Sequence, residues 1–122
     1  MKCVCVIGGS GFLGSHVADA LSEQGYRVRV FDRRVSPWLR HDQEMVVGDV
    51  MDPVAVTAAV AGTDVVYNFA ALADLNEAMH KPVETVRVNV LGNAHVLEAC
   101  REHGVGRFIY ASTVYVYSRQ GG

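Results

Sequence analysis

The chain has 122 residues, of which 50% are hydrophobic and 20% are charged, and its formal net charge at pH 7 is −2. This length suits one domain or part of one, and the apolar content excludes a disordered chain. The near-neutral charge gives no electrostatic basis for binding nucleic acid, and no apolar run reaches the roughly 18–20 residues that span a bilayer, so neither a nucleic-acid nor a membrane partner is expected.

Short runs rich in valine and isoleucine alternate along the chain with segments of helical periodicity. Strands are expected at residues 4–7, 27–31, 45–47, 65–69 and 107–111, and helices between residues 12 and 25, from 53 to 61 and from 82 to about 103. This alternation predicts an α/β protein with a parallel, doubly wound sheet of five strands. The related six-strand order 3-2-1-4-5-6 needs one strand more than the chain supplies. Residues 1–122 are therefore expected to be one portion of a larger protein.

The segment 82–103 is the longest helical run. On one stripe of its surface lie Val86, Val90, Ala94, Leu97 and Arg101. Because four of these five residues are small or apolar, we expect the stripe to face the sheet.

The cysteines and histidines show no spacing typical of a metal site, and none is expected. Three cysteines cannot all pair with one another, so we interpret them as reduced, apolar side chains of a cytoplasmic protein. His95 shares a helical face with Glu98 and Glu102, and this polar face is expected to be solvated.

A glycine-rich loop joins the first strand to the first helix. Gly8, Gly11 and Gly14 have the spacing G-x-x-G-x-x-G. Glycines here permit a tight turn, let a pyrophosphate approach the backbone and let the helix pack closely on the strand. The amides of Phe12 and Leu13, at the positive end of the helix dipole, would then donate to phosphate oxygens. The alternative is a glycine-rich turn without a ligand.

Asp32 lies 18 residues after Gly14, at the expected end of the second strand. A carboxylate at this place accepts hydrogen bonds from an adenosine ribose diol, and it repels a 2′-phosphate, which favours NAD over NADP. Arg33 and Arg34 follow directly and could bind that phosphate instead, so NADP stays the less favoured cofactor. A methyltransferase that binds S-adenosylmethionine has a similar loop, but it usually places an acidic residue just before the glycines, where this chain is apolar.

Four further segments agree with a known family. They are Gly48-Asp49-Val50, Asn68-Phe69-Ala70-Ala71, Asn89-Val90-Leu91-Gly92 and the stretch from Phe108 to Tyr117. Together with the glycine loop they resemble, in order and over essentially the whole chain, the motifs of the extended short-chain dehydrogenase/reductase family. The resemblance is to its NAD-dependent sugar-nucleotide epimerases and dehydratases. It implies a Rossmann fold and an NAD(P)-binding domain at residues 1–122.

The resemblance also implies roles for single residues. Asp49 would bind the adenine amino group, and Val50 would contact the ring. The residues Phe69, Ala70 and Ala71 would pass alongside the diphosphate and the nicotinamide ribose of the cofactor. Asn89 would pack beside the active site. Asp49 has a plainer alternative role as the cap of a turn.

The stretch 108–117 carries the hydroxyl groups that the resemblance places nearest the chemistry. Thr113 would be catalytic through a hydrogen bond to the substrate, and Ser112 would contact the cofactor, although both could be strand-end hydroxyls bonded to backbone. The central acid–base of the family is a tyrosine followed four residues later by lysine, and this pair does not occur in the sequence. The lysine charge lowers the pKa of the tyrosine toward neutrality. The chain is thus expected to end before the catalytic pair and the substrate domain, and to be inactive alone.

We therefore expect the intact protein to oxidise a hydroxyl group of a nucleotide-linked sugar by hydride transfer, in an epimerisation or a dehydration. The alternative is a non-catalytic module that binds NAD(P) and senses its redox state. An unpaired apolar edge at residues 107–117 also predicts pairing with a second copy, so a homodimer is expected.

Overall fold

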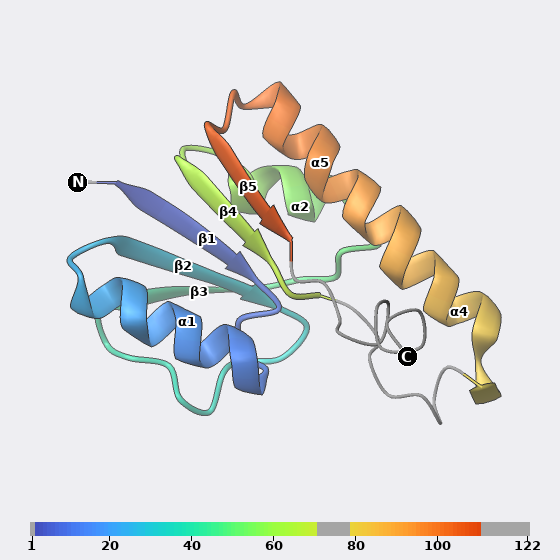
Figure 1. The fold of residues 1–122 in the computed structure, drawn as a ribbon, viewed down its shortest axis with the longest axis horizontal. Coiled ribbons are helices and arrows are strands. Elements are labelled where there is room, and N and C mark those ends of the chain that lie inside the picture. Colours follow the sequence, from blue (N-terminus) through green and yellow to red (C-terminus); the bar gives the residue numbers. More distant parts are fainter. Residues whose placement is uncertain (1, 71–78, 111–122) are drawn as a thin grey trace, which may run out of the picture.

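The computed structural model describes residues 2–70 and 79–110, which form a parallel sheet with helices on both faces (Figure 1). The strands are β1 (Cys3–Ile7), β2 (Arg27–Asp32), β3 (Gln43–Val47), β4 (Val65–Asn68) and β5 (Arg107–Tyr110). The helices are α1 (Phe12–Glu23), α2 (Pro53–Val60) and a continuous helical run of α4 (Pro82–Val86), the π-helix η1 (Arg87–Gly92) and α5 (Asn93–Glu102). The strand order is β3-β2-β1-β4-β5, which confirms the doubly wound prediction.

The central strand β1 explains why the sheet needs cover on both faces. All five of its residues are buried, and it pairs with β2 on one side and β4 on the other. Val4 and Val6 contribute to the core beneath α1, whereas Cys5 and Ile7 contribute to the core beneath α2 and α5. Successive residues of a strand point to opposite faces, so one uninterrupted apolar run supplies both cores.

The predicted start of α2 is confirmed. The carboxylate of Asp52 accepts hydrogen bonds from the amides of Val54 and Ala55, and Pro53 is the first residue of the helix. The first amides of a helix have no partner within it. The Asp52 carboxylate satisfies two of them, and proline lacks the N–H group altogether. The turn after α2 leads into β4, which is how the chain crosses from one edge of the sheet to its middle.

The expected orientation of the long helix is wrong. Val86, Val90, Ala94, Leu97 and Arg101 are all exposed. The buried residues of the helical run are Gly92, Val96, Ala99 and Cys100. The run therefore has two stripes of apolar residues, and the one with smaller side chains packs against β4 and α2. Close approach to the neighbouring elements favours small residues, and periodicity alone does not distinguish the two stripes.

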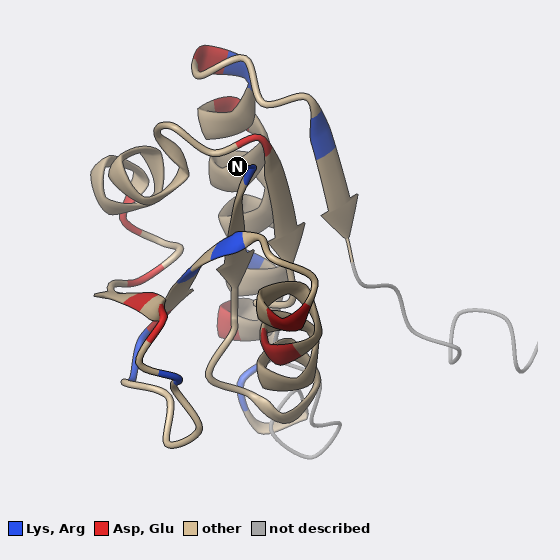
Figure 2. Cartoon of the chain, turned by 90° about the vertical axis from the view of Figure 1, so that its left-hand side faces the viewer, with Lys and Arg blue, Asp and Glu red and all other residues tan. Residues whose placement is uncertain are grey.

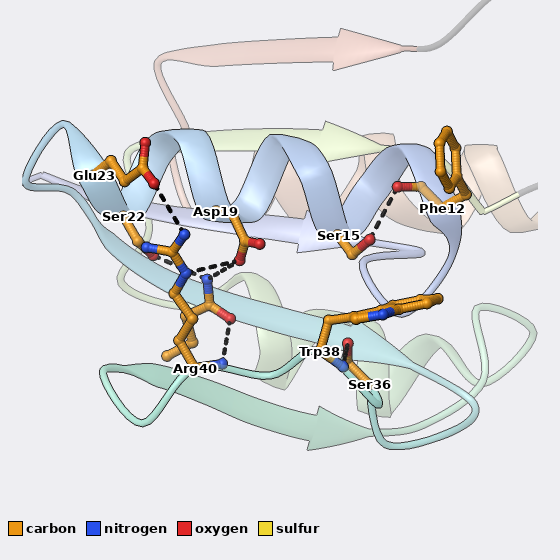
Figure 3. Close-up of polar contacts among 9 residues, drawn as sticks. Phe12, Ser15, Asp19, Ser22, Glu23, Ser36, Trp38 and Arg40 are labelled. Carbon is orange, nitrogen blue, oxygen red and sulfur yellow. Dashed lines mark hydrogen bonds and ion pairs between the residues drawn. The ribbon is translucent and has the colours of Figure 1, made fainter.

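Polar contacts connect α1 to the loop at residues 33–42 and to the first residue of β3 (Figure 3). Arg40 forms ion pairs with Asp19 and Glu23, and the buried amide of Gln43 donates to Asp19 and to Ser22. These partners explain why β3 begins at the polar residue Gln43, two residues before the expected start at 45.

Charged residues of both signs are distributed over the loops, the helices and some of the strands (Figure 2). Within the described ranges, no helix combines the length and the apolar character needed to cross a bilayer. The three cysteines are buried free thiols, as expected.

Candidate functional site

A pocket of about 220 Å³ opens at the carboxyl ends of the strands. Its lining consists of Ile7, Gly8, Gly11, Phe31, Asp32, Arg33, Gly48, Asp49, Val50, Phe69, Ala70 and Val88. These residues follow or end β1, β2, β3 and β4, apart from Val88 on η1. The strand order reverses between β1 and β4, and open α/β sheets bind ligands in the crevice at such a reversal. The volume is below the about 300–1,000 Å³ of whole small-molecule sites, so it suits part of a larger ligand.

The structure brings together eight residues that the sequence predicted for the cofactor. They are Gly8, Gly11, Asp32, Arg33, Asp49, Val50, Phe69 and Ala70. Sequence reasoning missed Ile7 and Phe31, which are the buried ends of two strands, and Gly48. It also missed Val88, although this residue directly precedes the predicted Asn89.

Two of the three predicted glycines of the loop, Gly8 and Gly14, have a steric reason to be glycine, whereas Gly11 has free space beside it. Gly8 has a positive φ of 80°, and a Cβ there would lie 2.7 Å from the backbone of Phe69 and Ala70. A Cβ on Gly14 would lie 2.3 Å from the carbonyl oxygen of Gly8, so this glycine lets α1 pack on the turn. A Cβ on Gly11 would meet nothing closer than 3.6 Å, which leaves space beside the loop for a ligand.

Helix α1 begins directly beside this space. Its N-cap residue Gly11 provides no side-chain hydrogen bond, and its first turn holds no acidic residue. Phe12 and Leu13 are 76% and 55% exposed. Neither residue lines the pocket, although the preceding Gly11 does. A helix N-terminus without a side-chain cap is suited to bind an anion through its amides.

The carboxylate of Asp32 is held by two backbone amides. Oδ2 accepts from the amide of Ser10 at 3.0 Å, and Oδ1 accepts from the amide of Arg33 at 2.6 Å. The hydroxyl of Ser10 in turn donates to the carbonyl of Arg34 at 2.6 Å. Ser10 was not predicted, and its position inside the glycine motif was the available signal. Each carboxylate oxygen has a second lone pair, which remains suited to a ribose hydroxyl.

Asp49 combines a position on the pocket wall with the plainer role of a turn. Its Oδ1 accepts from the amide of Met51 at 2.9 Å, and its carbonyl accepts from the amide of Asp52. Its Oδ2 lies 4.0 Å from Nε of Arg33. Both side chains of this ion pair are substantially exposed, so it contributes little to stability.

Two further predicted residues do not line the pocket. Gly14 is buried against the glycine loop, and Asn89 is half-buried on η1. The expected solvation of His95 is wrong, because this half-buried side chain places Nδ1 2.8 Å from the carbonyl oxygen of Val50.

The predicted residues Ala71, Ser112 and Thr113 lie outside the described residues. Among residues 2–70 and 79–110, no group of three or more histidine, cysteine or acidic side chains is arranged to hold a metal ion.

The sequence of this chain is similar to those of known proteins. A family model described as "NAD dependent epimerase/dehydratase family" matches residues 4–122. The chain is 38% identical over 120 residues to a 2-alkyl-3-oxoalkanoate reductase from Stenotrophomonas maltophilia (strain K279a), covering 95% of this chain and 34% of the reductase. It is 31% identical over 129 residues to a UDP-glucose 4-epimerase sequence from Klebsiella pneumoniae, covering 96% of this chain and 93% of that sequence.

A solved structure shares the fold. The crystal structure of UDP-glucose 4-epimerase from Brucella ovis in complex with NAD matches with a TM-score of 0.89 and 32% identity, covering 97% of this chain and 38% of that one. The chain thus spans about a third of the length of the reductase and of the solved epimerase.

Proposed function

Because the chain belongs to the NAD-dependent epimerase/dehydratase family, we propose that residues 1–122 form the NAD-binding part of an enzyme that acts on a nucleotide-linked sugar. The proposal rests chiefly on the pocket that joins the glycine loop, Asp32 and the turn after β3 at the carboxyl ends of the strands. Relatives named as UDP-glucose 4-epimerases support the substrate class.

The residues of the pocket fit the parts of NAD. The carboxylate of Asp32 would accept hydrogen bonds from the adenosine ribose, and Asp49 with Val50 would contact the adenine. The diphosphate would lie at Gly8, Gly11 and the first turn of α1, where Phe12, Leu13 and Gly14 begin the helix. The remaining proposed contacts are Arg33, Phe69, Ala70, Ala71, Asn89 and Ser112. When bound, NAD supplies a hydride acceptor for a sugar hydroxyl.

The charges around Asp32 favour NAD over NADP. A 2′-phosphate on the adenosine ribose would lie against a carboxylate that two backbone amides hold in place. Arg33 is the nearest cation on the pocket lining, and it pairs with Asp49. The repulsion between the Asp32 carboxylate and a 2′-phosphate costs more free energy than an ion pair between that phosphate and one exposed arginine would recover.

The substrate side of the proposal rests on the resemblance. Thr113 would orient the reacting hydroxyl, and a tyrosine of a Tyr-x-x-x-Lys pair would remove its proton. That pair does not occur in these 122 residues. We therefore expect the chain alone to bind NAD without turnover, with the pair and the substrate domain further along the gene.

A titration tests the cofactor. Isothermal titration calorimetry of the folded chain with NAD, NADP and S-adenosylmethionine is expected to show binding of NAD, weaker binding of NADP and no binding of S-adenosylmethionine. A folded chain that binds no NAD would overturn the proposal.

The second candidate is a non-catalytic NAD(P)-binding module that senses redox state. The reading frame after Gly122 distinguishes the two. A Tyr-x-x-x-Lys downstream supports the enzyme, whereas a stop codon supports the module.

A further inference from the structure

We propose that Asn93 and His95, both in the first turn of α5, are positioning residues that hold two different walls of the cofactor pocket. This inference rests on the proposed function, since it assigns the two walls to two parts of a dinucleotide. Neither residue lines the pocket itself. Each acts through a hydrogen bond to a distant segment that does.

His95 holds the turn after β3. Its Nδ1 lies 2.8 Å from the carbonyl oxygen of Val50, 45 residues earlier in the chain. A carbonyl only accepts hydrogen bonds, so Nδ1 carries the proton in this contact. Val50 is 6% exposed and lines the pocket. The imidazole therefore fixes the backbone of the wall that the proposed function assigns to adenine.

The helix backbone supports the same wall from a second side. A Cβ on Gly92 would lie 2.9 Å from Cγ2 of Val50, so the side chain of Val50 packs directly on the helix at this glycine. Val50 is thus held at its carbonyl by His95 and at its side chain by Gly92. Rotation of the turn would break both contacts.

Asn93 holds the end of β4. The amide of Asn68 is 0% exposed, and its Nδ2 donates to Oδ1 of Asn93 at 2.9 Å. The Oδ1 of Asn68 accepts a hydrogen bond from the backbone amide of Ala70 at 3.0 Å. Ala70 lines the pocket, and the backbone of Phe69 and Ala70 packs against Gly8.

These two bonds determine the orientation of the Asn68 amide. A flipped amide would oppose two donors at Ala70 and two acceptors at Asn93. Asn93 therefore acts through Asn68 on the segment that touches the glycine loop. This second wall adjoins Gly8, where the proposed function places the diphosphate, and the family resemblance puts Phe69 and Ala70 alongside the same group.

The separation of the two walls provides the test. AMP and NAD share the adenosine monophosphate part, whereas only NAD extends across the diphosphate. The wild-type chain and the variants His95→Gln and Asn93→Leu are each titrated with AMP and with NAD by calorimetry. The first variant removes the hydrogen bond to Val50, and the second removes the hydrogen bond from Asn68. His103→Gln serves as the matched control, because His103 is an exposed histidine at the end of the same helix.

We expect His95→Gln to weaken AMP and NAD alike by about three- to tenfold, as the loss of one hydrogen bond would. His95→Asn retains an amide donor at the δ position and should recover most of the affinity. Asn93→Leu should weaken NAD by a similar factor and leave AMP within about twofold. Asn93→Asp retains the acceptor oxygen, so it should bind NAD better than Asn93→Leu. Where Asn93→Leu fails to fold, Asn93→Ala, which removes the same acceptor without adding apolar bulk, takes its place in the test.

Equal weakening of both ligands by Asn93→Leu, or unchanged affinities in both variants, would overturn the positioning roles while leaving the proposed function intact. A folded wild-type chain that binds neither NAD nor AMP would instead refute the proposed function.

Discussion

The backbone amide of Ser10 donates to Oδ2 of Asp32 at 3.0 Å, although 22 residues separate the two in the sequence. Ser10 belongs to the glycine loop, and Asp32 ends β2. One carboxylate thus fixes the loop and faces the pocket at the same time. Charge at this position has both a structural and a ligand-binding consequence.

Replacement of Asp32 by asparagine tests the second consequence. The variant keeps one carbonyl oxygen as an acceptor but loses the negative charge, so the repulsion of a 2′-phosphate disappears. We expect the affinity for NAD to fall about tenfold and the preference for NAD over NADP to narrow or reverse. Calorimetry with both cofactors measures this, with Asp42→Asn as a control for the loss of one exposed charge. An unchanged ratio of the two affinities would contradict the proposed role of Asp32.

The glycine loop permits a paired test of stability and binding. Gly14→Ala places a Cβ 2.3 Å from the carbonyl oxygen of Gly8, so we expect a loss of several kcal/mol of unfolding free energy or a failure to fold. Gly11→Ala meets nothing within 3.6 Å and should fold with near-normal stability, yet bind NAD more weakly because its methyl group enters the space beside the loop. Urea unfolding and calorimetry separate the two effects, and equal destabilisation by both substitutions would refute the assignment.

Sequence patterns predicted the parts of the fold that depend on local chemistry. The uninterrupted apolar run of β1 and the cap at Asp52 each follow from local residue chemistry, and the alternation of strands with helices predicted the doubly wound sheet that the structure shows. Eight predicted site residues meet in one pocket because they follow strands whose carboxyl ends share an edge.

Contacts between distant segments could not be predicted in the same way. The bond from His95 to Val50 joins two residues that each have an ordinary local explanation. The face of the long helix was likewise ambiguous, since Val90 and Val96 lie on two different apolar stripes. Only the packing of small residues against the sheet distinguishes them.

The buried thiol of Cys5 predicts a loss of stability at alkaline pH. Burial raises the pKa of this thiol from 9.0 to about 12, although the charge of Arg29 opposes the shift. Above pH 9 the unfolded chain loses the thiol proton while the folded chain keeps it, so rising pH favours unfolding until about pH 12. The contribution is complete below pH 9 and should decrease by about 1 kcal/mol per pH unit above it. Urea unfolding from pH 8 to 10.5 should show a shallower decline for Cys5→Ala, and parallel curves would contradict the assignment.

Strand β5 predicts self-association. It pairs with β4 on one side, and no described strand lies on its other side. Sedimentation velocity is expected to show a dimer that dissociates on dilution, and Ile109→Lys should shift it toward monomer by placing a charge on the edge strand. Leu97→Lys changes the exposed face of the long helix and should leave the dimer unchanged. If only Leu97→Lys abolishes the dimer, the edge strand is not the interface.

The substitution of valine by alanine should affect the unfolding free energy differently on the two stripes of the long helix. Val96 is 0% exposed and belongs to the core beneath α2 and α5, so Val96→Ala should lower the unfolding free energy by about 2 kcal/mol through lost burial and the cavity left behind. Val90 is 65% exposed, and Val90→Ala should change stability by less than about 0.5 kcal/mol, because little buried area is lost and alanine has the higher helix propensity. Urea unfolding of the two variants measures the difference. A cost for Val90→Ala as large as that for Val96→Ala would mean that the outer stripe is packed in the chain, as periodicity alone suggested.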